Sequence, residues 1–525
     1  MSVMKRMALV GGALVILAWA VAPALAQETP RQGGILRVGQ YHEPTSLDPH
    51  VAHDPPGLRP RNHIFEGLVT WDEHTNPVPM LTESWKASAN GKLFTFTLRK
   101  GVKFHNGQEL TSEDVVWSLD RFMKLSARRG DLRHVSEVNA VDRYTVEVAL
   151  KEATPTFIPA LSQYFPLIMN KEASEAQLAQ HKQIVQPVGT GPFKLVEWKR
   201  GQYIRLERFN DYVARTEKTS GYAGRKVAYL DQILWIPIPD NAVRVLALEK
   251  GEIDYAEVIP YEDVTRLKSV KDVTVGVAPG TWWSALYFNT RIPPFDKLDA
   301  RRAVAAAINY QDLIVQVFAG YGRVANSLIP DVQRAWRTPT HARTHEFNPG
   351  RAKELLKKAG YDGSPIVLES VNHTLSRETG DTLFAQLRAV GLNVDLKQQE
   401  LGAHLDSMYQ RSKRGTVPRW HMSTLVGSAF RPDPHFHYGI RVHSKEHPGW
   451  YKNPRLDALI EEASKTLDTP QRIKLYDEAQ KIVMDEVPLI VLNHYDHIDA
   501  YQNHLRGVRV LDPFYEMFWN VWIGR

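Results

Sequence analysis

Four histidines within thirteen residues are the side chains of this sequence best suited to metal chemistry. They are His435, His437, His443 and His447, in the stretch HFHYGIRVHSKEH. Neutral imidazoles bind nickel, zinc and haem iron, so this stretch could hold a metal ion or a metal chelate. No HExxH pattern and no cysteine strengthens that interpretation, and the alternative is a solvated polar loop rich in proline and glycine.

We recognise no motif in the sequence that indicates enzyme chemistry. The 525 residues contain no cysteine, which excludes thiol catalysis and disulfide bonds. No phosphate-binding loop of the G-x-x-x-x-G-K-[ST] type is present. The sequence GSAF at 427–430 lacks the G-x-S-x-G pattern of a nucleophile elbow. We therefore expect a protein that is not an enzyme, and we expect no cofactor.

Regular elements must position any site, and one stretch defines them clearly. Leu93–Lys100 (LFTFTLRK) alternates apolar and polar residues, which predicts a strand with one buried face. Asn106-Gly107 predicts a turn. Thr111, with Asp114 three residues later, forms a loose capping box before an apolar-periodic run. The predicted order is strand, turn and capped helix.

The rest of the chain continues the alternation of strands and helices, which predicts α/β lobes. Further strands are predicted at 34–39, 193–196, 203–208, 233–236, 366–370 and 392–396. Helices are predicted at 241–251, 301–318, 351–360, 377–390, 455–465 and 470–487.

The N-terminus predicts export. Lys5 and Arg6 precede an apolar run at 7–22 and an A-x-A site at 24–26, as in a signal peptide cleaved after Ala26. An uncleaved anchor is the alternative, but the run falls short of about 18 apolar residues. Without a cysteine there is no site for a lipid anchor. We expect a free protein of the periplasm.

The charge pattern argues against nucleic acid as a partner. Losing Lys5 and Arg6 with the signal peptide lowers the formal net charge from +6 to +4. Basic and acidic residues are interleaved, and no basic tract occurs. So small and dispersed an excess does not indicate nucleic-acid binding.

Several segments occur in an order that resembles a known family. They are SLDP at 46–49, the string of 64–121 around the predicted capped helix, VGTGPFKLVEWKRGQYIRLERFNDY at 188–212, LYFNTRIPPFDKLDARRAVAAAI at 286–308, NPRLDALIEE at 453–462 and VPLIVL at 487–492. Together they resemble the family 5 extracytoplasmic solute-binding proteins, the peptide/nickel-type receptors of bacterial ABC importers. The resemblance covers nearly the whole chain after the signal peptide.

The resemblance implies an α/β fold of the two-lobed periplasmic binding protein type (type II, cluster C-like). Residues 27–70, 186–287 and 490–525 would form the first lobe, 71–185 an extra α/β domain on it, and 288–489 the second lobe. The implied function is that of a monomeric receptor that closes around a peptide or peptide-like solute and delivers it to an inner-membrane permease. The alternatives are a receptor for a nickel chelate or haem, using the histidines, or for another organic solute.

The resemblance also implies ligand-binding positions on the first lobe and near the hinge. In peptide-binding members the loop after SLDP runs along the ligand backbone, and here it contains His53, Asp54 and Pro55. Trp282 and Trp283 precede the FN motif. We expect Trp282 to face the cleft, and one of the two could simply be core. His494, which we place one helical turn from His497, lies near the implied hinge, where a hydrogen bond between the lobes is the simplest role.

The second lobe departs from the pattern of peptide receptors. Di- and oligopeptide receptors carry an aspartate three residues before an Asp-Pro pair, and this aspartate binds the ligand's α-amino group. By alignment Phe430 stands there, and Gly427 stands where a tryptophan is common. Unless Asp433 or Asp54 replaces that carboxylate, peptides with a free N-terminus are in doubt, because a buried unpaired ammonium is costly. The same segment also supplies the candidates Thr424, where an oligopeptide receptor has an arginine, and Ser428.

Arg431 has two possible roles. Its guanidinium suits a carboxylate or phosphate on the ligand, but it could equally form a structural ion pair with Asp433 or another acid. Together with Phe430, Trp282 and Trp283, the first role favours a solute with an anionic group and an apolar body. Blocked peptides, opines and organic-acid conjugates are such solutes.

Overall fold

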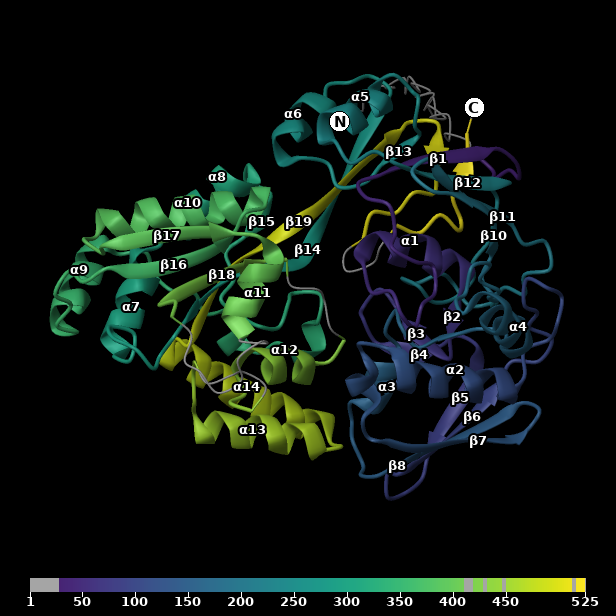
Figure 1. The fold of residues 1–525 in the computed structure, drawn as a ribbon, viewed down its shortest axis with the longest axis horizontal. Helices are drawn as coiled ribbons and strands as arrows, with labels where there is room; N and C mark the ends of the chain where they lie inside the picture. The colour runs from purple at the N-terminus through teal and green to yellow at the C-terminus, as the bar shows by residue number, and fades with distance from the viewer. Residues whose placement is uncertain (1–27, 410–418, 428–431, 446–449, 512–515, 525) are drawn as a thin grey trace, which may run out of the picture.

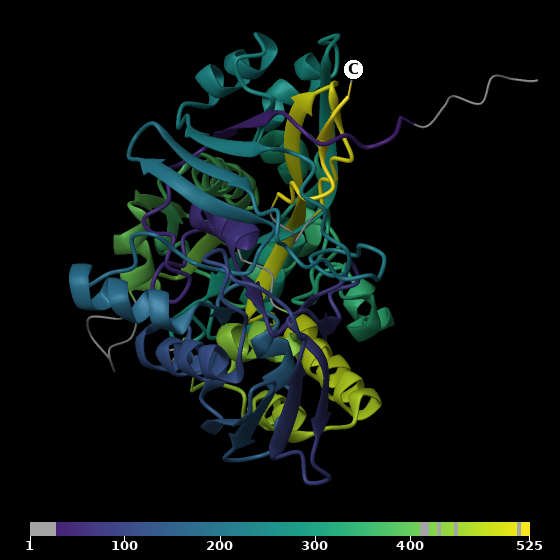
Figure 2. The same cartoon turned by 90° about the vertical axis from the view of Figure 1, so that its right-hand side faces the viewer.

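Two long strands run diagonally through the middle of the molecule and belong to both of its halves (Figure 1). They are β14 (Val273–Phe288) and β19 (Leu489–Gln502), paired antiparallel in a computed structural model that describes residues 28–409, 419–427, 432–445, 450–511 and 516–524. Figure 2 shows β19 extending from the top of the molecule toward α14 (Thr469–Glu486). Among these residues, no helix combines the length and the apolarity that crossing a membrane would need.

The first half extends the sheet from β19 through β13 (Tyr255–Ala256) to the N-terminal strand β1 (Ile35–Gln40). Beyond β1 the order is β12 (Gln232–Pro237), β11 (Tyr203–Arg208) and β10 (Phe193–Lys199). The other elements here are α1 (Pro55–Ile64), α5 (Asn241–Glu249), η2 (Tyr261–Asp263), α6 (Val264–Leu267) and the pair β20 (Leu505–Arg506) and β21 (Trp522–Ile523).

The second half extends the same sheet from β14 through β18 (Met422–Val426) and β16 (Ile366–Val371) to β17 (Val394–Gln399), while β15 (Gly322–Arg323) pairs with β19. Its helices are α7 (Leu298–Ala307), α8 (Tyr310–Phe318), α9 (Pro349–Lys358), α10 (Thr374–Ala389), α11 (Leu401–Tyr409), α12 (Pro434–Val442), α13 (Pro454–Lys465) and α14. Short turns η3 (Arg334–Trp336) and η4 (Pro339–Ala342) precede α9.

A separate antiparallel sheet stands beside the first half, in the order β5 (Thr82–Ala87), β6 (Leu93–Leu98), β8 (Thr145–Leu150) and β7 (Val135–Asp142). We refer to residues 82–161 as the β5–β8 region. It includes α2 (Ser112–Leu125), η1 (Arg129–Leu132) and α3 (Phe157–Leu161). Flanking elements are β2 (Glu66–Gly67), β3 (Val69–Trp71), β4 (Pro77–Pro79), β9 (Leu167–Ile168) and α4 (Lys171–His181).

Local signals placed many boundaries correctly. The predicted cap of α2 is present, because the Asp114 carboxylate accepts hydrogen bonds from the backbone N–H and the hydroxyl of Thr111, each at 3.0 Å. Gly251 and Gly360 follow α5 and α9 with φ of +71° and +66°, which an L side chain rarely adopts. Both predicted helix ends are confirmed.

The single helix predicted at 301–318 is wrong. The structure has two helices, and the break falls at Ile308, whose backbone is extended (φ −86°, ψ 120°). Asn309 then starts α8, because its side chain accepts a hydrogen bond from the N–H of Asp312 at 3.0 Å. The apolar periodicity continues across the break, and the short amide that caps a new helix decides the structure. In addition β17 begins at Val394, two residues later than predicted.

Two local predictions about histidines are also corrected. His435 and His437 lie in α12 rather than in a loop, because Asp433 caps that helix and Pro434 suits its first turn. His494 and His497 lie in strand β19, not one helical turn apart. Residues three apart in a strand point to opposite faces, so these two histidines do not act together.

Candidate functional site

The two halves meet where the pairing of β14 with β19 is interrupted. Ala278 pairs with His497 and the next pair is Trp282 with Tyr495, so three residues of β14 face one residue of β19. Such a bulge bends a strand and redirects side chains. Gly280 is required here, because a Cβ at this position would lie 1.5 Å from the carbonyl oxygen of Tyr495.

Arg323 braces this bulge. Its guanidinium donates to the carbonyl of Gly280 at 2.8 Å and forms an ion pair with Asp331. It also lies 3.5 Å from Asp496, whose carboxylate accepts the N–H of Gly280 at 3.2 Å. The side chains of Arg323, Asp331 and Asp496 therefore hold the bulge in place. The backbone of the bulge itself is not paired with β19.

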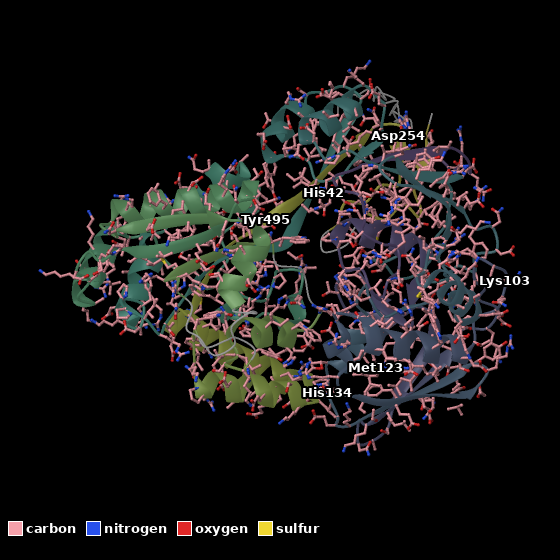
Figure 3. All side chains as sticks on the ribbon, in the orientation of Figure 1. His42, Lys103, Met123, His134, Asp254 and Tyr495 are labelled. Atoms are coloured by element: carbon pink, nitrogen blue, oxygen red, sulfur yellow. The ribbon has the colours of Figure 1, made fainter. Side chains whose placement is uncertain are left out.

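One face of the crossing presents two aromatic residues, which we call, together with Gly427, the crossing patch. Trp282 and Tyr495 are cross-strand partners, and both are only partly buried. A Cβ on Gly427 would lie 3.6 Å from the Tyr495 hydroxyl and 3.7 Å from the Trp282 ring, so Gly427 lies directly beside both rings. Tyr495 also stacks on Phe318, with 5.0 Å between the ring centres, and Trp282 packs against the core cluster of the β5–β8 region. Figure 3 shows Tyr495 where the halves meet. An indole and a phenol offer a large contact area with polar handles.

The opposite face of the same ribbon is core. Trp283 is 1% exposed, packs in a cluster with Tyr287 and Trp450, and has the guanidinium of Arg441 5.1 Å from its ring centre. His494, its cross-strand partner, is fully buried, and burial lowers the pKa of His494 to about 3. Neither side chain has surface for a solute. A contact between Trp282 and a solute stays a prediction.

The loop candidates serve local structure. His53 hydrogen-bonds Ser126 at the end of α2 through Nε2 (2.8 Å), and burial lowers the pKa of His53 to about 4. The Asp54 carboxylate caps α1 by accepting the N–H of Gly57 at 3.0 Å and also accepts the hydroxyl of Thr45 at 2.7 Å. Pro55 opens α1. These contacts fix the loop's position in the first half, and a role in binding stays a prediction.

The second-lobe candidates that the structure describes are also engaged. Asp433 forms a buried two-pronged ion pair with Arg472, at 2.8 and 3.0 Å, so it is not available to Arg431 or to a ligand amine. Thr424 is fully buried in β18, with its hydroxyl 3.4 Å from the carbonyl of Glu369. Ser428, Phe430 and Arg431 lie outside the described residues.

The clustered histidines do not converge on a metal site in the described part of the chain. His437 is buried, His443 faces Glu461 at 3.3 Å, and His447 lies outside that part. Burial lowers the pKa of His435 to about 4 and of His437 to about 3, so both rings are neutral at pH 7. In that part, the triad that could hold a metal comprises His497, Asp499 and Glu516 instead.

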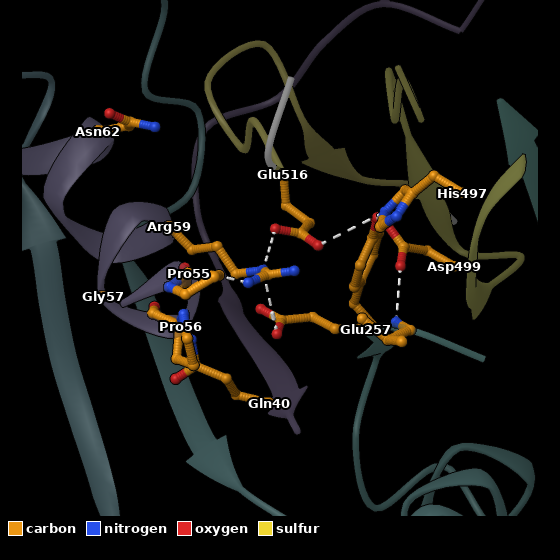
Figure 4. A network of polar contacts seen from close by, with 12 residues as sticks. Gln40, Pro55, Pro56, Gly57, Arg59, Asn62, Glu257, His497, Asp499 and Glu516 are labelled. Atoms are coloured by element: carbon orange, nitrogen blue, oxygen red, sulfur yellow. Dashed lines mark hydrogen bonds and ion pairs between the residues drawn. The ribbon is translucent and has the colours of Figure 1, made fainter. Parts of the chain in front are cut away.

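That triad belongs to a buried charge network which the sequence did not reveal (Figure 4). Arg59 Nε lies 2.5 Å from Glu516 and 3.2 Å from Glu257. Burial raises the pKa of both glutamates. Burial also pushes the pKa of Asp499 upward, but His497 (2.9 Å) and Tyr255 (2.5 Å) bring it below its ordinary value.

Protein groups already engage Asp499 and Glu516 in this network. Asp499 also accepts the N–H of Val258 at 2.8 Å, so three donors surround its carboxylate, and Arg59 supplies the cation beside Glu516. Its members come from α1, β19 and the segments after β13 and before β21. No spacing in the sequence could have connected them.

Another buried ion pair connects two of the sequence segments that carry the family resemblance. Arg121 of α2 forms two hydrogen bonds with the carboxylate of Asp48, at 2.5 and 2.8 Å, and also contacts His50. Asp48 belongs to SLDP, and Arg121 ends the string with the capped helix. The pair joins the β5–β8 region to the first half and so positions the loop of His53.

One cavity lies away from the crossing. It measures about 550 Å³ and opens beside β10 and β11. Its charged side chains pair with one another, Lys194 with Glu207 at 2.9 Å and Arg208 with Asp231 at 3.0 Å. No unpaired charge there favours a ligand, so the crossing patch is the better candidate.

Two α/β halves that share their central strands and meet at a bulge define a two-lobed solute-binding fold. Residues 76–446 match the family model described as bacterial extracellular solute-binding proteins, family 5 Middle, and the chain belongs to that family. Its members are extracytoplasmic binding proteins of transport systems.

Relatives agree over nearly the full length. The glutathione-binding protein GsiB of Salmonella paratyphi A is 28% identical over 490 residues, which cover 89% of this chain and 90% of GsiB. The substrate-binding protein CtaP of Listeria monocytogenes superposes with a TM-score of 0.81 at 24% identity, covering 94% of this chain and 100% of CtaP. DppA of Helicobacter pylori, in complex with the peptide STSA, gives 0.78 at 24% identity and covers 94% and 99%.

Proposed function

We propose that this protein is the periplasmic receptor of an ABC importer and captures peptides or peptide-like solutes between its lobes. The observation that carries the proposal is the crossing patch, whose two aromatic side chains are only partly buried where the lobes meet. The names of GsiB, a glutathione-binding protein, and of DppA in complex with a peptide support this solute class. No bond is made or broken. A solute that contacts both lobes stabilises their closed arrangement, which an inner-membrane permease then recognises.

The proposed solutes are blocked or anionic rather than ordinary free peptides. Asp433 is held by Arg472 and Asp54 caps α1, so neither replaces the aspartate for which Phe430 stands. Burying an α-ammonium without a carboxylate would be costly. Arg431, whose guanidinium suits a carboxylate, is the residue that we propose for the anionic group of the solute.

We also propose the division into a first lobe (27–70, 186–287, 490–525), an extra domain (71–185) and a second lobe (288–489). The four-stranded sheet lies within the range of the extra domain, and β16, β17 and β18 lie within that of the second lobe. The first lobe and its extra domain would move as one unit, because Arg121 and Asp48 join them. The receptor would be a monomer, exported through cleavage after Ala26.

Mass spectrometry of solute released from the purified protein, with metal analysis of the same sample, tests this function. We expect about one blocked, acidic or non-peptide solute per chain. Peptides with ordinary free N-termini would show that the interpretation of Phe430 is wrong while leaving the receptor function intact. Stoichiometric nickel or iron would instead establish a metal-chelate receptor, and turnover of the solute would contradict the proposal.

Replacing Trp282 with alanine should weaken binding of the recovered solute by about tenfold, through lost aromatic contact area. Calorimetric titration measures the change. Trp85→Ala is a matched control, because Trp85 and Trp282 are both partly buried and both pack against the core cluster of the β5–β8 region. Equal affinity in both variants would exclude the crossing patch from the binding site.

A further inference from the structure

The second lobe touches the β5–β8 region at residues other than those of the crossing patch. The hydroxyl of Thr154 donates to the backbone carbonyl of Ser464 at 3.3 Å. Beside it, a Cβ on Gly91 would lie 3.1 Å from a Leu467 methyl and 3.2 Å from Ala153. Leu467, in the turn between α13 and α14, therefore packs against the turn between β5 and β6.

A larger apolar contact lies behind these. Phe436 of α12 is only 6% exposed and belongs to the core cluster of the β5–β8 region. Its helix belongs to the second lobe, so an aromatic side chain of one lobe is buried in the core of the other. Figure 1 shows α12 and α13 facing α3 and β8, and Figure 3 labels His134 at this lower rim.

The second-lobe side of this contact is one rigid unit. Arg472 of α14 binds Asp433, which caps α12, and its Nε donates to the carbonyl of Ala463 in α13 at 2.9 Å. The three helices that present Phe436 and Leu467 are thus fixed to one another. The opposing side is fixed too, since the Thr154 hydroxyl bonds that of Thr156 at 2.9 Å.

We propose that this contact is a latch that holds the lobes together even without solute. The rim latch comprises Gly91, Ala153 and Thr154 on the β5–β8 region and Phe436, Ser464 and Leu467 on the second lobe. Opening the lobes exposes Phe436 and the packed side of Leu467 to water, which disfavours the open state. The β5–β8 region would then contribute directly to the stability of the closed state. The biological role rests on the proposed receptor function, but the latch itself is testable without any solute.

The test measures lobe separation in ligand-free protein by single-molecule energy transfer. Because the chain has no cysteine, Glu83→Cys and Lys474→Cys give unique labels on the two sides. We expect a closed population in the wild type, and Leu467→Ala should lower the closed-to-open ratio about fivefold, since roughly half of that side chain is buried. Leu467→Asp should lower it further.

Leu246→Ala is the matched control, because Leu246 on α5 is 47% exposed against 53% for Leu467 and lies at the opposite end of the molecule (Figure 1). Its ratio should equal that of the wild type. A wild type that is entirely open without solute would overturn the proposal, as would equal ratios in the Leu467 and Leu246 variants. Failure to recover a solute would count against the receptor function, not against the latch.

Discussion

Replacing Arg59 with methionine is expected to lower the free energy of unfolding at pH 7 by about 3–5 kcal/mol, because it leaves two buried carboxylates without their cation. Arg59 is 2% exposed and lies between Glu257 and Glu516, which are both buried. Methionine keeps most of the length of the side chain, which limits the cavity. Urea unfolding of both proteins measures the difference.

The same variant has a characteristic pH dependence. Burial raises the pKa of Glu257 and of Glu516 above the ordinary value of 4.5. A raised carboxyl pKa stabilises the folded protein below the unfolded pKa, and that stability is lost as pH rises toward the folded pKa. Without Arg59 both pKa values should rise further, so the deficit of Arg59→Met should be smaller at pH 5 than at pH 7.

Arg343→Met is the control for Arg59. Its guanidinium also contacts a carboxylate, that of Asp485 at 3.2 Å, but both side chains are at least half exposed. Exposed pairs contribute about 0–1 kcal/mol, so this variant should unfold almost like the wild type. A loss at Arg59 no larger than that at Arg343, or one that does not change with pH, would contradict the role assigned to the network.

The wild-type protein should lose stability as pH falls from 7 to 5, and His63 should account for about 2 kcal/mol of this loss. His63 is fully buried. Its Nδ1 donates to the carbonyl of Arg59 and its Nε2 accepts the N–H of Phe518, each at 2.9 Å. If the ring were protonated, Nε2 would also carry a hydrogen. Two N–H groups, that of Nε2 and that of Phe518, would then face each other without an acceptor.

The direction follows from the pKa. Burial lowers the pKa of His63 from 6.5 to about 3, so the unfolded chain binds a proton that the folded protein rejects. The stability is present above the unfolded pKa of 6.5 and is lost as pH falls toward 3. Urea unfolding at pH 7 and pH 5 should therefore show a pH effect about 2 kcal/mol smaller in His63→Gln than in the wild type. His74→Gln, at an exposed position, should keep the full effect.

Local chemistry predicted the elements, and long-range packing decided much of the site. Thr111 and Asp114 fix the start of α2 by themselves, so that boundary could be read from the sequence. The break at Ile308 could not, because the apolar pattern is continuous across it. Likewise, the sequence HYDH at 494–497 would place its two histidines on one face of a helix but on opposite faces of a strand. Only the pairing of β19 with β14 selects the strand.

The candidate site shows the same limit. The division between Trp282 and Trp283 was expected from their adjacency, and the structure makes Trp283 core. Tyr495 was missed because its position opposite Trp282 depends on a bulge at Gly280. Reading 489–502 as a strand would have placed Tyr495 on the face opposite His494, which is the one signal that was available.

The position of β19 in the chain has a consequence for biosynthesis. β19 lies between β13 and β14, so the strands of the two halves are not joined into one sheet until residues 489–502 have been made. A ribosome produces those residues near the end of translation, and their partner β14 was made more than two hundred residues earlier. Such long-range pairing is slow. The nascent chain therefore cannot join its two halves during most of its synthesis, and the bulge where they meet forms only near its end.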